Sequence, residues 1–165
     1  MSEFIGLPIE GDINMPDAQV DQRPIEELAD LLKAVLESPL IYAIRWHQYT
    51  PYFNDGDACV FSVNEPYFRF SPLDVDLEEG VDQDGFFYSC DDEFKAILGG
   101  RRWNSETRSY DPIKSPNPEL SEMVSQLSTA MESGAHNVAL INLFGDHAKV
   151  TATPEKFIVD EYDHD

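Results

Sequence analysis

The chain has 165 residues, which suits one domain, and its 42% of apolar residues is enough for a packed core. Eleven Lys and Arg stand against 32 Asp and Glu, so the net charge is −21 at pH 7. A field of this sign repels nucleic-acid phosphates and anionic membranes, and we therefore expect neither as a direct partner.

The sequence predicts a cytoplasmic protein. Cys59 and Cys90 are the only cysteines, too few for a disulfide framework. The N-terminus lacks the basic region and apolar run of a signal peptide. No apolar stretch approaches the roughly 20 residues that are needed to cross a bilayer.

The first elements are an irregular N-terminal arm over residues 1–23 and then one folded domain over residues 24–165. The arm holds scattered Gly, Pro and acidic residues without a period. The domain opens with a helix over 24–37, because apolar residues recur there at helical spacing: Ile25, Leu28, Leu31, Leu32, Val35 and Leu36. Ser38-Pro39 ends this helix.

Two strands are predicted next, over residues 40–49 and 58–63, since both are rich in aromatic and β-branched residues. Asn54–Asp57 between them has the residue types of a hairpin connection, which makes the two strands antiparallel neighbours. A third strand is expected around Tyr67–Phe70.

Residues 71–93 form an acid-rich stretch without Lys or Arg. A short helix is expected at 91–98, ended by Gly99-Gly100. Residues 101–115 form a loop in which four of the eleven basic residues surround Trp103 and Tyr110. These are the residue types of a nucleic-acid patch, but the net charge favours docking of the loop on the protein's own acids.

The C-terminal part predicts a helix over 117–132, a short helix over 138–144, and two strands over 148–153 and 156–162. Asn117-Pro118 supplies a good N-cap followed by a first-turn proline. The fold class that follows is α+β, with a mostly antiparallel sheet and the two main helices, 24–37 and 117–132, packed on one of its faces.

Two segments carry a resemblance. The first is Trp46-His47-Gln48-Tyr49-Thr50-Pro51-Tyr52-Phe53-Asn54-Asp55-Gly56-Asp57, and the second runs from Phe144-Gly145-Asp146-His147 to the C-terminal Glu161-Tyr162-Asp163-His164-Asp165. Together they resemble a family of small uncharacterised proteins of bacteriophages and bacteria, over about a third of the chain. The resemblance implies a phage or prophage context, hence a host cytoplasm, and no particular activity.

Aromatic and acidic residues around the predicted hairpin connection are the first candidate binding residues. Exposed aromatic rings beside carboxylates suit a cationic or aromatic ligand. The alternative is structural, because Asn-Asp-Gly is what a tight turn requires. This set is Tyr49, Tyr52, Phe53, Asn54, Asp55 and Asp57.

A second candidate is a metal site at the C-terminus, where the final hairpin would bring Asp146-His147 close to Asp163, His164 and Asp165. If a metal is bound, the ligands expected are His147, Asp163 and His164. The spacing matches no zinc signature, so we expect no cofactor and no stoichiometric metal. The corresponding functional hypothesis is a small metal-dependent enzyme that uses His47, Asp55, Asp57, His147 and His164.

The leading hypothesis is a non-enzymatic interaction protein that presents acids to a basic surface of a host or phage protein. A sharper form is mimicry of nucleic acid, in which spaced carboxylates imitate phosphates. The alternative is that the charge serves only solubility. The acids that best fit a binding role are Asp74, Asp76, Glu78, Glu79, Asp82 and Asp84.

Overall fold

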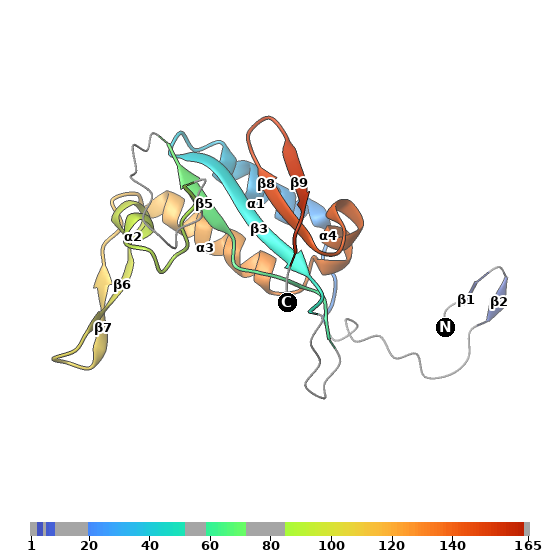
Figure 1. The fold of residues 1–165 in the computed structure, drawn as a ribbon, viewed down its shortest axis with the longest axis horizontal. Helices are drawn as coiled ribbons and strands as arrows, with labels where there is room; N and C mark the ends of the chain where they lie inside the picture. The colour runs from blue at the N-terminus through green and yellow to red at the C-terminus, as the bar shows by residue number, and fades with distance from the viewer. Residues whose placement is uncertain (1–2, 5, 9–19, 52–58, 72–84, 164–165) are drawn as a thin grey trace.

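The computed structural model describes residues 3–4, 6–8, 20–51, 59–71 and 85–163. Its body is one antiparallel sheet with helices on one face, and a hairpin projects from one end of that body (Figure 1). The predicted α+β class is thereby confirmed. No helix in these residues combines the length and the apolar character that crossing a membrane requires.

The sheet is built around β3 (Ile41–Tyr49), its longest strand. One edge of β3 pairs with β8 (Ala148–Ala152), which in turn pairs with β9 (Phe157–Glu161). The other edge pairs with β5 (Tyr67–Phe70) and, further along, with β4 (Ser62–Val63). Every pairing in this sheet is antiparallel. In the part of the chain that the structure describes, β9 pairs only with β8, so it forms one border of the sheet.

The predicted pairing of the first two strands is confirmed by the register, in which Gln48 faces Val63 and Tyr49 faces Ser62. The second strand is shorter than predicted, because Cys59, Val60 and Phe61 lie outside any strand. The connection predicted at Asn54–Asp57 falls outside the described residues.

The two main helices, α1 (Ile25–Leu36) and α3 (Pro118–Glu132), lie together against one face of the sheet, as predicted. Their apolar stripes recur every three or four residues, so each helix buries one side and leaves the other to solvent. The most buried positions of the two stripes are Leu28, Leu32, Val35, Leu120, Val124, Leu127 and Met131.

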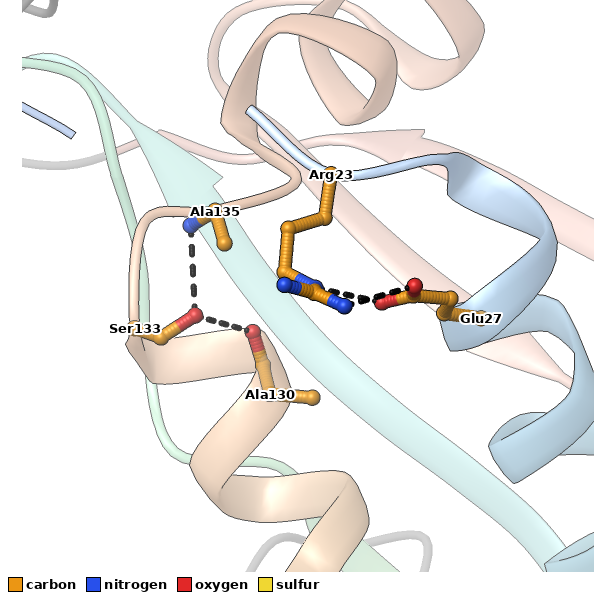
Figure 2. A network of polar contacts seen from close by, with 5 residues as sticks. All are labelled: Arg23, Glu27, Ala130, Ser133 and Ala135. Carbon is orange, nitrogen blue, oxygen red and sulfur yellow. Dashed lines mark hydrogen bonds and ion pairs between the residues drawn. The ribbon is translucent and has the colours of Figure 1, made fainter. Parts of the chain in front are cut away.

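The start of α1 is tied to the end of α3, and Figure 2 shows the polar contacts within each of these two segments. The backbone N–H of Arg23 donates to Ala135 O at 2.8 Å. Ser133 Oγ donates to Ala130 O and accepts from the Ala135 N–H, which satisfies groups that the helix end leaves without partners. Arg23 also forms an exposed bidentate pair with Glu27, at 2.6 and 2.8 Å.

The shorter predicted elements are also present. Helix α2 (Asp92–Leu98) ends at Gly99, and α4 (Asn137–Phe144) ends at Gly145. The N-terminal arm differs from the prediction: β1 (Glu3–Phe4) and β2 (Leu7–Pro8) form a small antiparallel pair. Gly6, with a positive φ of 77°, makes this tight reversal accessible.

The prediction of a docked loop at 101–115 is wrong. The segment forms a two-stranded hairpin of β6 (Gly100–Asn104) and β7 (Ser109–Ile113), which points away from the body (Figure 1). Trp103 and Tyr110 face each other across it and are 53% and 62% exposed. Among the described residues its one ion pair with the body is Arg102–Asp92, a long and exposed contact of 3.9 Å.

The reason the hairpin escaped prediction is its turn, which contains no Gly, Asn-Gly or Asp-Gly. Instead, Asn104 Oδ1 accepts hydrogen bonds from the N–H groups of Glu106 and Thr107. Arg108 takes the positive φ, at 52°. The Asn104 side chain therefore stabilises the turn, in which a non-glycine residue adopts the left-handed conformation.

Candidate functional site: an open sheet edge beside an apolar groove

An apolar groove of about 920 Å³ opens between α1, α4 and the turn that joins β8 to β9. This volume lies within the usual range of ligand-binding pockets. The charged residues that line the groove are all exposed to solvent. The apolar wall consists of Leu28, Leu32, Leu36, Leu140, Leu143, Phe144 and Phe157, and the charged lining residues are Lys33, Glu37, Glu155 and Lys156.

Strand β9 borders this groove and exposes an unusual run of apolar side chains. Phe157, Ile158 and Val159 are 50%, 40% and 47% exposed, although they are consecutive residues of a strand. Acids flank them, with Glu155 on one side and Asp160, Glu161 and Asp163 on the other. A border strand of this kind is a template for pairing with another chain.

The groove keeps its shape because Gln48 fixes α4 to the sheet. Its buried side-chain amide donates to Leu140 O at 2.9 Å and to Gly145 O at 2.7 Å. Its Oε1 accepts from Trp46 Nε1 at 3.0 Å, and the Trp46 ring packs edge-on against Phe144. One side chain of β3 thus holds both the middle and the end of α4.

The opposite face of the sheet carries an aromatic cluster that includes the one predicted binding residue within the described range, Tyr49. The Tyr49 ring lies 5.4 Å from that of Tyr162, which stacks on His47 at 4.0 Å and 12°. Tyr67 Oη lies 3.1 Å from His47 Nε2, and Tyr88 stacks on Tyr67. Tyr49 therefore belongs to a set of rings that pack on one another.

Of the predicted metal ligands, the structure describes His147 and Asp163. His147 Nε2 lies 3.4 Å from Glu161 Oε1, and its backbone O accepts from the Tyr162 N–H. In the part of the chain that the structure describes, no three His, Cys, Asp or Glu gather as a set that could hold a metal ion. His164 and Asp165 lie outside that part.

Asp146 is held by hydrogen bonds. Burial raises the pKa of this carboxyl, but hydrogen bonds from Thr50 Oγ1 and from the N–H groups of His147 and Thr50 outweigh burial and lower the pKa below its usual value. Asp146 thus joins the end of β3 to the residues that lead into β8.

Replacing Asp146 by Asn should destabilise the protein near pH 7 by about 1 kcal/mol, because its charged hydrogen bonds to Thr50 are weakened. A carboxyl with a lowered folded-state pKa contributes stability above its unfolded pKa, near about 4, and loses it as the pH falls through the folded value. The gap between wild type and variant in urea unfolding should therefore narrow as the pH is lowered from 7 to below about 4. An equal gap at both pH values would contradict this role.

The other predicted binding residues cannot be compared with the structure. Tyr52, Phe53, Asn54, Asp55 and Asp57 lie outside the described residues, and so do the six acids from Asp74 to Asp84. The enzyme hypothesis depends on Asp55, Asp57 and His164, which are outside as well.

Sequence reasoning missed the groove and the exposed edge. The signal that was present is the run Phe157-Ile158-Val159, which does not alternate with polar residues as a half-buried strand should. Such a run is typical of a strand that is covered on both faces. Here β9 is exposed along its whole length.

Comparisons of the chain with protein-family models, with curated proteins and with solved structures find no match. The resemblance to small phage and bacterial proteins stays a prediction, and the functional argument below depends on the geometry and charge of the molecule.

Proposed function

We propose that this chain is an interaction protein that binds a basic surface of another protein. The observation that carries the proposal is the apolar edge strand β9, flanked by acids, in a molecule with a net charge of −21. Exposed apolar patches with polar rims are typical of protein-binding surfaces. The acidic field adds attraction for basic partners and repulsion for acidic ones.

The distribution of charge strengthens this proposal. Four of the eleven basic residues belong to residues 101–114. These basic residues therefore lie on the projecting hairpin and its base, and not on the body of the molecule. The rest of the chain is consequently even more acidic than the whole. Focused fields of one sign raise association rates with oppositely charged partners by about 10- to 1000-fold.

Neutralising Asp74, Asp76, Glu78, Glu79, Asp82 and Asp84 to Asn and Gln should slow partner association by about tenfold, mainly through the on-rate. The immobilised protein would first capture partners from host lysate at about 50 mM salt, and association of a purified partner would then be measured at about 50 and about 300 mM. Binding should weaken with salt, since screening shortens the reach of the field to roughly 8 Å or less.

A matched control neutralises six exposed acids on or next to the helices and away from the groove lining: Asp21, Glu26, Asp30, Glu119, Glu122 and Glu132. It changes the net charge equally, and its effect on the on-rate should be smaller. If neither variant alters the rate or the salt dependence, the acids serve only solubility and the proposal fails. If duplex DNA competes for the captured partner, that partner uses a nucleic-acid groove, as mimicry requires.

A further inference from the structure

The edge of β9 has a definite pattern of hydrogen-bonding groups. The Thr153 N–H donates to Lys156 O at 2.9 Å, and the Tyr162 N–H donates to His147 O at 3.2 Å. Between these points the register of β8 and β9 runs without interruption. In an antiparallel pair, every second residue bonds to the neighbouring strand. Ile158 and Asp160 therefore bond to β8.

It follows that the backbone N–H and C=O groups of Phe157, Val159 and Glu161 point away from β8, toward the border of the sheet. Among the described residues no strand pairs with β9 on that side. Three residues with outward donors and acceptors, spaced by two, are what an added antiparallel or parallel strand requires.

The side chains of this edge define two different faces. Phe157 and Val159 stand opposite Ala152 and Val150, which are fully buried toward the helices, so they belong to the side of the groove. The Phe157 ring lies 5.2 Å from Phe144 in the groove wall. Ile158 and Asp160 stand on the other side. The groove side of the edge thus carries Phe157 and Val159 followed by Glu161, which stands opposite Ala148. The other side carries Ile158 and Asp160, and Asp160 stands opposite Lys149.

We propose that the partner binds by adding an extended segment to the β9 edge, with apolar side chains against Phe157 and Val159 and Lys or Arg beside the acids that follow, Asp160, Glu161 and Asp163. This inference rests on the proposed function and specifies its mode of binding. Charge selects the occupant, because four acids, Glu155, Asp160, Glu161 and Asp163, stand around the edge against two bases, Lys156 and the Lys149 that faces Asp160. A second copy of the chain would set acid against acid, with both molecules at −21.

The test uses a fluorescent synthetic peptide of about ten residues that alternates Val and Lys. Binding to the full chain is measured by anisotropy, and amide exchange is followed by NMR. The peptide should bind and should protect the amides of Phe157, Val159 and Glu161 by about tenfold or more, because these amides gain partners. A peptide with N-methyl groups on alternate residues keeps the charge but should lose most of this affinity.

The variant Val159→Pro removes one outward N–H and keeps the bonds to β8, as proline does on edge strands. It should weaken peptide binding at least tenfold, whereas the control Val159→Thr, which keeps the N–H, should bind like wild type. Ile158→Pro should instead destabilise the fold, since it removes a bond to β8. Circular dichroism and thermal unfolding would verify that Val159→Pro remains folded.

The outcomes separate the two proposals. If Val159→Pro and the N-methylated peptide bind as well as their parents, and salt still weakens binding, strand addition is overturned and attraction to basic partners stands. If the peptide binds without protecting the three outward amides, strand addition is overturned in the same way. If the peptide fails to bind at both about 50 and about 300 mM salt, strand addition is again overturned. The proposed function is then decided separately, by what the protein captures from lysate and by the on-rates of the acid-neutralised variants.

Discussion

Replacing Gln48 by Leu should lower the free energy of unfolding by about 3 kcal/mol and loosen α4. The substitution removes the acceptor for Trp46 Nε1 and the donor for Leu140 O and Gly145 O. Gln48 is fully buried, so water does not readily replace these bonds. Each buried polar group that loses its partner costs about 1–3 kcal/mol.

Hydrogen exchange would locate the effect, since the amides of α4 should exchange faster in Gln48→Leu than in wild type. Because α4 forms one wall of the groove, the Val–Lys peptide should also bind more weakly. The matched control is Trp46→Phe, which deletes one donor to Gln48 and keeps an aromatic ring against Phe144. Trp46 is also fully buried, so Trp46→Phe opens a cavity in the core, and the decisive comparison is exchange in α4. Equal acceleration of α4 exchange in the two variants, or unchanged exchange in Gln48→Leu, would contradict the anchoring role of Gln48.

Replacing Gly99 by Ala should destabilise the protein by about 3 kcal/mol or more. Gly99 has φ 79° and ψ −174°, a combination that is essentially confined to glycine. A Cβ there would lie 2.6 Å from Ile113 O and 2.8 Å from Ser115 N. Both atoms belong to the backbone at the base of the projecting hairpin, so the clash displaces the hairpin itself.

Gly145 offers a matched control for this prediction. It ends α4 with φ 92° and ψ 172°, and a Cβ there would meet no atom within 4 Å. Gly145→Ala should therefore cost only the backbone strain, about 1–3 kcal/mol. Urea unfolding of the two variants measures the difference, and exchange should rise around Ile113 only in Gly99→Ala. Equal destabilisation would mean that the close approach to Ile113 does not matter.

Local pattern in the sequence was enough to predict most of the secondary structure. The spacing of Leu28, Leu32 and Val35 determines which side of α1 is buried, whatever it packs against. Asn117-Pro118 marks the start of α3, and Gly99 and Gly145 mark the ends of α2 and α4. These signals act within a few residues, which is why they can be interpreted without the fold. The hairpin at Gly100–Ile113 was not predicted, because Arg108 rather than a glycine takes the positive φ of its turn, and Asn104 stabilises that turn by side-chain hydrogen bonds.

The candidate site could not be predicted in the same way. Of the predicted binding residues, only Tyr49 lies in the described structure, and it packs among aromatic rings rather than beside the groove. The composition indicated an acidic partner-binding molecule, but it carries no information about which strand borders the sheet.

The sequence alone determined the charge, most of the elements and the inward stripes of α1 and α3. Only the tertiary structure decided that β9 has a neighbour on one side, that α1 and α4 stand apart to leave a groove, and that Phe157–Val159 is exposed. Each of these facts depends on contacts between residues that are far apart in the chain, such as Gln48 with Leu140 and Gly145. Hydrophobic patterning indicates that a residue favours burial, whereas the order of the strands decides whether a neighbouring strand or helix covers that residue.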